Sequence, residues 1–154
     1  MSVQMSFLLR ARDAAKNAGH AWPEFAACEA ALESAWGTSK LAVQGSNLFG
    51  QKQSHPAIVG TETLSMPTRE MLHGEWTVVP ADWVKFPDWE GCFQARMELL
   101  RRLGPRYPDY ASALTAANGE QFVVEVSKAW STDPQRAGKV LALHDEYKEV
   151  FVSL

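Results

Sequence analysis

One segment, from about residue 58 to residue 86, breaks the pattern of an otherwise helix-forming chain. It is rich in β-branched residues, threonine and tryptophan, and it is interrupted by Pro67, His73-Gly74 and Pro80. This punctuation predicts a small antiparallel hairpin or a three-stranded lobe, with His73-Gly74 as a turn. The chain must therefore fold into a helical body that carries one small β lobe.

Apolar residues recur at helical spacing on both sides of this segment. The expected helices cover residues 3–17, 23–37, 39–44, 89–103, 110–117 and 120–130. A last helix is expected from Asp133-Pro134 onward, with Asp133 as its cap and Pro134 at its first position. With 154 residues, of which 46% are hydrophobic, the chain 1–154 suits a single domain around one core. The predicted class is α+β, mainly α.

Charge, hydropathy and histidine spacing exclude several kinds of partner. The formal net charge of -3 offers no basic surface for a phosphate backbone, so we expect no nucleic-acid partner. No stretch approaches the roughly 18 apolar residues of a membrane span, and the N-terminus does not resemble a signal peptide. The four histidines show no metal-ligand spacing, so we expect no metal and no cofactor.

The two cysteines, Cys28 and Cys92, both lie in apolar helical contexts. Such positions favour buried free thiols, because an unpaired cysteine behaves as a small hydrophobic residue. A disulfide between them is the alternative, which spacing alone does not decide.

Glu33 occupies a position where a carboxyl group could act as an acid. At about 100° per residue, Phe25, Leu32 and Trp36 fall within a narrow arc, and Glu33 lies roughly 80° to its side. Protonation of a glycosidic oxygen at neutral pH needs a carboxyl group in such an apolar setting. Glu29 falls between the apolar stripe and Glu33, so periodicity leaves both glutamates open, as acids or as surface residues at the edge of the core.

Two motifs in this part of the chain resemble a known family. The run Ala31-Leu32-Glu33-Ser34-Ala35-Trp36-Gly37 is followed about ten residues later by Asn47-Leu48-Phe49-Gly50. In this order and spacing, the pair resembles the signature of glycoside hydrolase family 73. These are the peptidoglycan-hydrolysing endo-β-N-acetylglucosaminidases of flagellar-rod muramidase-like proteins, autolysins and phage lysins.

Later segments extend the resemblance from about Trp22 to Tyr147. The motifs that resemble the family's β-lobe and C-terminal segments are Pro67-Thr68-Arg69-Glu70, Gly74-Glu75-Trp76, Trp83-Val84-Lys85-Phe86 with Asp88-Trp89, and Trp130-Ser131-Thr132-Asp133-Pro134. The resemblance implies a lysozyme-like helical body with the β lobe at about 58–86.

The resemblance also implies roles for two carboxyl groups. Glu33 matches the general acid, and Glu70 matches a second carboxylate on the mobile lobe. Glu75 is the rival of Glu70, which is favoured because Thr68 precedes it at the motif spacing. Two positions depart from the family pattern and bear on substrate positioning. Trp130 replaces a tyrosine and so has no hydroxyl, and Arg136 replaces another aromatic residue.

Several further residues are candidates for substrate binding. Asn47 and Phe49 are expected to shape the floor of the cleft, although Asn47 could equally stabilise its own turn. Trp76, Trp83 and Trp130 could stack on sugar rings, and the first two could instead pack within the lobe.

The expected activity is hydrolysis of the β-1,4 bond between N-acetylglucosamine and N-acetylmuramic acid in peptidoglycan glycan strands. Either water activated at Glu70 or the substrate's own 2-acetamido group would complete the reaction. The alternatives are a lytic transglycosylase, which leaves 1,6-anhydro ends, and a catalytically weak wall-binding module. We expect a monomer that acts on the cell wall, in the periplasm or outside the cell. It would be exported without an evident signal peptide or encoded by a phage.

Overall fold

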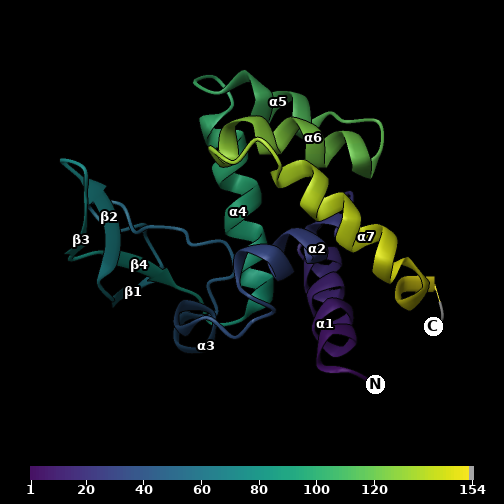
Figure 1. Ribbon diagram of the computed structural model, residues 1–154, viewed down its shortest axis with the longest axis horizontal. Coiled ribbons are helices and arrows are strands. Elements are labelled where there is room, and N and C mark those ends of the chain that lie inside the picture. Colours follow the sequence, from purple (N-terminus) through teal and green to yellow (C-terminus); the bar gives the residue numbers. More distant parts are fainter. Residues whose placement is uncertain (153–154) are drawn as a thin grey trace.

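Seven helices form the body of the molecule and four short strands form a lobe beside it, in the computed structural model, which describes residues 1–152 (Figure 1). The helices are α1 (Val3–Asn17), α2 (Pro23–Glu33), α3 (Lys40–Gly45), α4 (Trp89–Leu103), α5 (Pro108–Leu114), α6 (Gly119–Trp130) and α7 (Arg136–Val152). The strands are β1 (Glu62–Ser65), β2 (Thr68–Leu72), β3 (Glu75–Val79) and β4 (Asp82–Lys85). The predicted helical body with one β lobe is thereby confirmed.

Four of the helices begin where a short polar side chain accepts a hydrogen bond from a backbone N–H group. The caps accept from the backbone N–H three residues later, and they are Ser2 of α1, Ser39 of α3, Asp88 of α4 and Asn118 of α6. Pro23 and Pro108 open α2 and α5, as proline can at a first helical position. Local sequence therefore sets the starts of six helices.

The central helix α2 is buried from Phe25 to Ala31. Four alanines on it let α1, α6 and α7 approach its backbone closely, and these contacts form the core of the body. Gly119, at the start of α6, lies directly on the ring of Phe25, where an added Cβ would come within 2.1 Å of a ring carbon. Cys28 and Cys92 are buried in the same core as free thiols, which confirms the favoured interpretation.

The lobe consists of two separate two-stranded antiparallel sheets, in which β1 pairs with β4 and β2 with β3. The expected hairpin is present as β2–β3, but the lobe has four strands and not two or three, because β1 and β4 flank the hairpin and pair as a second sheet. The turn at His73-Gly74 is confirmed: both residues have positive φ, at 52° and 82°.

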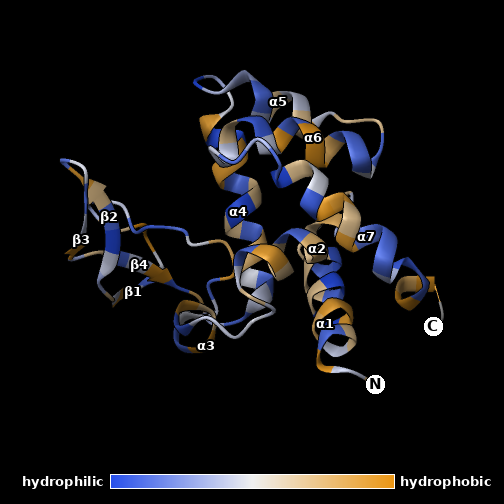
Figure 2. Cartoon of the chain, viewed as in Figure 1, coloured by the Kyte–Doolittle hydropathy of each residue, from blue (hydrophilic) through white to orange (hydrophobic). Residues whose placement is uncertain are grey.

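The hairpin β2–β3 projects from the helical body (Figure 1). Its apolar side chains are not covered, and Figure 2 shows hydrophobic residues on this projecting part as well as on the helices. The exposed apolar side chains of the hairpin are Met71, Leu72, Trp76 and Val78. None of the helices within residues 1–152 is long and apolar enough to cross a membrane.

Three helices have boundaries that differ from the expectation by more than one residue. Helix α5 covers Pro108–Leu114 and not 110–117, because Pro108 opens it. Helix α2 ends at Glu33 and not at Gly37, because Ala35, Trp36 and Gly37 are in the left-handed conformation, with φ of 51°, 59° and 77°. Trp36 therefore does not continue the apolar stripe of α2, and instead packs against Phe7 and Tyr147. Helix α7 begins at Arg136, after a turn in which the Asp133 side chain accepts the backbone N–H of Gln135 at 2.9 Å.

Candidate active site

Glu33 is the last residue of α2, and the turn after it is fixed by the buried hydroxyl of Ser34. This hydroxyl donates to the carbonyl of Ala30 at 2.6 Å and accepts the backbone N–H of Gly37 at 2.9 Å. Such bonds hold the left-handed turn, whose conformation is costly for residues other than glycine. The side chain of Glu33 is 25% exposed as a result, at the boundary between core and solvent.

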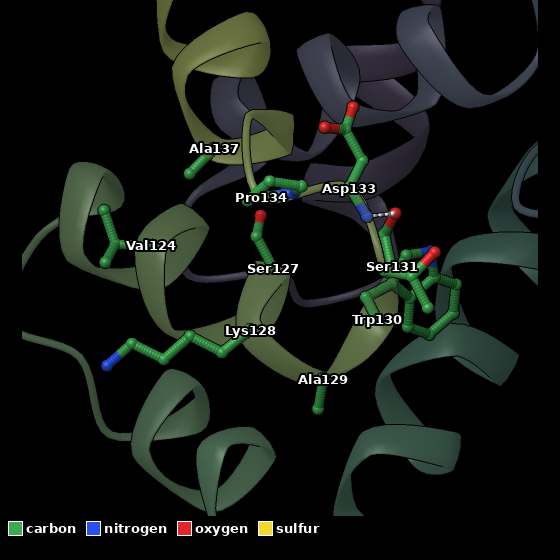
Figure 3. Close-up of a pocket in the computed structure, with 10 residues that line it drawn as sticks. Val124, Ser127, Lys128, Ala129, Trp130, Ser131, Asp133, Pro134 and Ala137 are labelled. Atoms are coloured by element: carbon green, nitrogen blue, oxygen red, sulfur yellow. Dashed lines mark hydrogen bonds between the residues drawn. The ribbon is translucent and has the colours of Figure 1, made fainter.

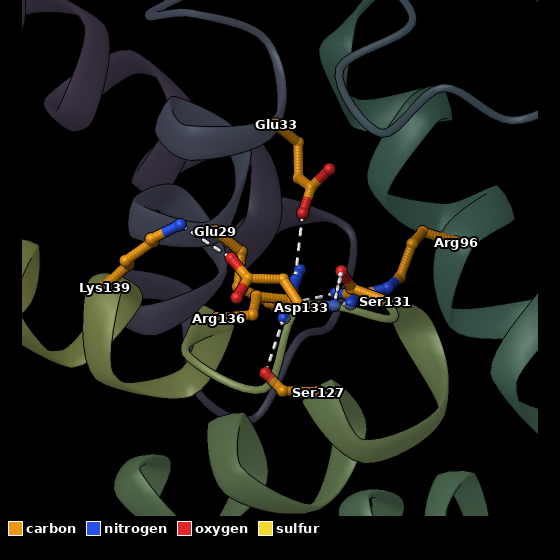
Figure 4. A network of polar contacts seen from close by, with 8 residues as sticks. All are labelled: Glu29, Glu33, Arg96, Ser127, Ser131, Asp133, Arg136 and Lys139. Carbon is orange, nitrogen blue, oxygen red and sulfur yellow. Dashed lines mark hydrogen bonds and ion pairs between the residues drawn. The ribbon is translucent and has the colours of Figure 1, made fainter. Parts of the chain in front are cut away.

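Glu33 is one of four charged side chains that contact one another at this point (Figure 4). Arg96 of α4 donates two bonds of 2.8 Å to Glu29, one to each carboxylate oxygen. Arg136 of α7 donates to Oε2 of Glu29 at 2.8 Å and, through Nε, to Oε1 of Glu33 at 2.9 Å. Its remaining nitrogen, Nη1, donates to the hydroxyl of Ser127 at 2.8 Å. We call Glu29, Glu33, Arg96 and Arg136 the charge network.

The buried members of the network are charged. Burial would raise the pKa of Glu29, but Arg96 and Arg136 outweigh it by attraction and hydrogen bonding and lower this pKa to about 2. For Arg136 burial would lower the pKa, because it disfavours the charged form here too. The carboxylates of Glu29 and Glu33 outweigh this effect and raise the pKa of Arg136 above its usual value. Glu29 is therefore an anion that compensates two buried guanidinium groups.

Glu29 and Glu33, between which periodicity does not choose, differ in access to solvent. Glu29 is completely buried and both of its carboxylate oxygens accept from arginine, so it is not the surface residue that the sequence allowed. Glu33 accepts only at Oε1, and its Oε2 has no hydrogen-bond partner within residues 1–152. Only Glu33 therefore has an oxygen available to a ligand.

Glu70 lies on β2, away from the charge network. Its carboxylate forms an ion pair of 3.0 Å with Lys52, and no ion pair or hydrogen bond joins it to Glu33 in the part of the chain described. Glu75 on β3 lies opposite Leu72, two residues after Glu70, so both glutamates are on the same face of the hairpin. Figure 1 shows the hairpin well apart from α2, so the structure does not bring Glu33 and Glu70 together.

Asn47 and Phe49 both lie inside the protein. The side-chain N–H bonds of Asn47 go to the carbonyls of Gln51 and Val84, both at 2.9 Å, and its Oδ1 accepts the backbone N–H of Gln51. These contacts fit the turn-stabilising alternative for Asn47. The buried ring of Phe49 packs on Trp130 and carries the Arg96 guanidinium 4.5 Å from its centre.

The three candidate tryptophans have different surroundings. Trp130 is half-buried, and the centre of its ring also lies 4.5 Å from the Arg96 guanidinium, with the ring nearly perpendicular to that of Phe49. Trp83 is half-buried and donates its indole N–H to the carbonyl of Met66 at 2.8 Å. Trp76 has 63% of its surface exposed, and the guanidinium of Arg69, also on the hairpin, lies 5.4 Å from the centre of its ring. It has the most open ring face of the three.

A pocket of about 680 Å³ lies between the end of α6 and the start of α7 (Figure 3). Its lining includes Trp130, Ser127, Ser131 and Asp133, but not Glu33. Figure 4 places Ser127, one of the lining residues, and Glu33 on opposite sides of the Arg136 guanidinium. Within residues 1–152 no group of His, Cys, Asp and Glu side chains could hold a metal ion.

Sequence reasoning missed the charge network as a unit. Arg96 and Arg136 are 67 and 107 residues from Glu29 in the sequence, so no local sequence pattern predicts that they contact it. One signal was available: Glu29 and Glu33 are four residues apart and therefore neighbours on one helix face, where two carboxylates repel unless a cation lies between them. Arg136 is that cation.

Comparison with known proteins gives consistent matches. A model of the glucosaminidase family, described as mannosyl-glycoprotein endo-beta-N-acetylglucosaminidase, matches residues 9–149. The exo-glucosaminidase LytG of Bacillus subtilis (strain 168) is 29% identical over 142 residues, which make up 88% of this chain and 49% of LytG. The chain thus spans about half the length of this curated relative.

Two solved structures show the same fold at similar sequence identity. The catalytic domain of the autolysin Auto from Listeria monocytogenes has a TM-score of 0.80 and 25% identity, covering 98% of this chain and 88% of that one. The C-terminally truncated glycoside hydrolase domain of Salmonella typhimurium FlgJ has a TM-score of 0.72 and 27% identity, covering 95% and 98%.

Proposed function

The chain belongs to the glucosaminidase family, glycoside hydrolase family 73, and from this premise we propose that it hydrolyses the glycan strands of peptidoglycan. The bond cleaved is the β-1,4 bond that follows N-acetylglucosamine. The substrate is the bacterial cell wall, so the protein acts in the periplasm or outside the cell. The names of the relatives support this choice, since they include an autolysin and a glucosaminidase.

Glu33 is the general acid in this proposal. The observation that supports this role is the difference between the two carboxylate oxygens of Glu33. Oε1 accepts a hydrogen bond from Arg136, whereas Oε2 has no hydrogen-bond partner among residues 1–152 and lies at the edge of the helical body. A proton on Oε2 can be delivered to the leaving glycosidic oxygen while the anomeric carbon gains oxocarbenium character. Glu29 offers no such oxygen, because arginines occupy both.

Glu70 is the second carboxylate, and it acts after the hairpin approaches the body. Lys52 holds its carboxylate at 3.0 Å in this open arrangement, and the exposed hairpin has little contact with the helices that would oppose a movement. Movement of a lobe that completes a site is common among enzymes. Trp76 and Trp83 of the lobe and Trp130 of the body then bind the sugars on either side, with Asn47 and Phe49 beneath them.

The products of purified peptidoglycan test the proposal. Mass spectrometry should detect new reducing ends on N-acetylglucosamine, whereas 1,6-anhydro ends would identify a lytic transglycosylase. Binding to sacculi without any release of fragments would identify a wall-binding module. Strands labelled at one end separate internal cleavage, as in the family description, from the terminal cleavage that the name of LytG indicates.

The same assay separates the two lobe carboxylates. Glu70→Gln should lower turnover about tenfold or more, since general base assistance is typically worth 10²–10⁴-fold. Glu75→Gln is the matched control, because it is the same substitution on the same face of the hairpin. Equal losses in both variants would remove the preference for Glu70.

A further inference from the structure

We propose that Arg136 is the positioning residue of the acid: it anchors Oε1 of Glu33 and so directs the proton to Oε2. This inference rests on the proposed role of Glu33. Arg136 is a positioning residue and not a catalytic one, because it is 98% buried and bonded to protein groups through all three nitrogens.

The guanidinium of Arg136 is held from three directions. Its bonds of 2.8–2.9 Å reach Glu33 and Glu29 on α2 and Ser127 on α6, while Arg136 itself begins α7. A guanidinium is a rigid planar fork, so three bonds to separate partners determine both its position and its orientation. Figure 4 shows Glu33 at the open end of this arrangement.

The anchor is itself fixed. Glu29, a partner of Arg136, accepts hydrogen bonds from Arg96 at both oxygens, and the Arg96 guanidinium packs against the rings of Phe49 and Trp130, which are nearly perpendicular to each other. The order of contacts is thus Arg96, Glu29, Arg136, Glu33, with only the last member reaching solvent. Displacement of the Glu33 carboxylate therefore stretches its hydrogen bond to Arg136, which is held in turn by Glu29 and Ser127.

This anchoring determines which oxygen carries the proton. A neutral carboxyl group can be protonated at either oxygen, but Oε1 faces an N–H of Arg136 and must accept there. The proton is therefore carried by Oε2. When the Oε2–H bond breaks and a new O–H bond forms on the leaving sugar, the resulting carboxylate remains paired with a cation that does not need to move. Water supplies the hydroxyl to the anomeric carbon.

A purely structural role for Arg136 makes a different prediction. If Arg136 only compensated the charge of Glu29, its replacement would lower stability and leave the turnover of the folded fraction unchanged. If it positions Glu33, kcat falls while KM does not, since an error of 1 Å in a reacting group can cost about 10²-fold.

The experiment measures kcat and KM on soluble, uncrosslinked glycan strands, with the folded fraction determined by circular dichroism. Arg136→Lys keeps the charge but cannot reach three acceptors at once. It should lower kcat at least tenfold and change KM less than twofold. If Arg136→Lys does not fold, Arg136→Gln replaces it with the same expectation, because Glu29 keeps both of its bonds from Arg96. Leu8→Ala on α1, a fully buried core position on a helix that gives no side chain to the network, controls for destabilisation and should keep the wild-type kcat.

Glu33→Gln, measured alongside, separates the inference from the proposed function. If Glu33→Gln is inactive and Arg136→Lys keeps the wild-type kcat, the positioning role is wrong and the acid stands. If Glu33→Gln remains active, the assignment of Glu33 as the acid fails, and the positioning role of Arg136 fails with it. Adding Arg136→Lys to Glu33→Gln should cause no further loss, because Arg136 acts through Glu33.

Discussion

Arg96 and Glu29 form a completely buried ion pair with two parallel bonds, Nη1 to Oε1 and Nη2 to Oε2, each of 2.8 Å. The pair joins α4 to the central helix α2, and Arg136 extends it to α7. These three side chains are buried, so a charge that lost its partner would not be solvated. Each charge is therefore stabilised only while its partner is present. The helices that carry the acid are thus connected by the same charges that orient it.

The first prediction concerns the stability of this network. Glu29→Gln leaves the buried guanidinium of Arg96 without an anion and leaves Arg136 with Glu33 alone, so we expect the free energy of unfolding to fall by about 3–5 kcal/mol. Urea unfolding at pH 7 measures the change. Glu98→Gln on the exposed side of α4 is the control and should change stability by less than about 0.5 kcal/mol. Equal, small effects in both variants would show that the network contributes little.

The second prediction concerns acid. His20 is buried against the ring of Phe122 and accepts the backbone N–H of Trp22 at 2.9 Å. Burial, assisted by repulsion from Arg96, lowers its pKa from 6.5 to about 4. Between these values the unfolded chain binds more protons than the folded one, so stability is fully present above pH 6.5 and is lost as the pH falls towards 4. Glu29 adds a second loss, between its unfolded value of 4.5 and its folded pKa of about 2.

The measurement is urea unfolding at a series of pH values from 7.5 to 4. His20 should contribute a loss of about 3 kcal/mol over this range, since each pKa unit is worth about 1.4 kcal/mol. His20→Asn keeps an acceptor near the Nδ1 position but does not titrate, so its stability should fall less steeply. Parallel pH profiles for the two proteins would contradict the assignment to His20.

The third prediction concerns a close contact in the core. Gly119→Ala places a Cβ 2.1 Å from a carbon of the Phe25 ring, so α6 must shift, at a cost of about 1–3 kcal/mol. Gly138→Ala on α7 is the matched control, because a Cβ there meets nothing within 4 Å. It should be neutral or stabilising by up to about 1 kcal/mol. Thermal unfolding of the two variants tests the difference, and a stable Gly119→Ala would be inconsistent with this packing.

The fourth prediction concerns the cysteines. Burial raises the pKa of both Cys28 and Cys92 to about 12, so almost no thiolate exists at neutral pH. A disulfide-exchange reagent should therefore leave the native protein unlabelled at pH 7.5 and react with two thiols per chain in urea. Rapid labelling of the native protein would mean that the core around α2 opens readily.

Local sequence rules were sufficient for most of the fold. Capping residues and prolines set helix starts, and His73-Gly74 set the hairpin turn, because these features depend on a few neighbouring residues. The end of α2 was not predictable in this way. Its left-handed turn is stabilised by Ser34 and by packing of Trp36 against α1 and α7, which only the assembled fold supplies.

The candidate site also combines features that local sequence predicted with features that only the assembled fold supplies. The motif around Glu33 identified the candidate acid, whereas the burial of Glu29 and the role of Arg136 depend on contacts between three distant helices. Arg136 was noticed only as a departure from the family pattern, and the geometry shows what this departure contacts. Hydrophobic periodicity also did not predict the two separate sheets of the lobe. It reports on neighbouring residues, whereas β1 and β4 pair although the whole hairpin lies between them in the sequence.

The most direct test of the account is the rate at which Glu33→Gln releases reducing ends from purified peptidoglycan. Glutamine keeps an oxygen for Arg136 to bind but has no proton to donate to the leaving sugar. We expect the rate to fall at least about 100-fold, with the fold intact and with Glu98→Gln at the wild-type rate. A Glu33→Gln variant that retains more than about a tenth of the wild-type rate would contradict the assignment of Glu33 as the acid.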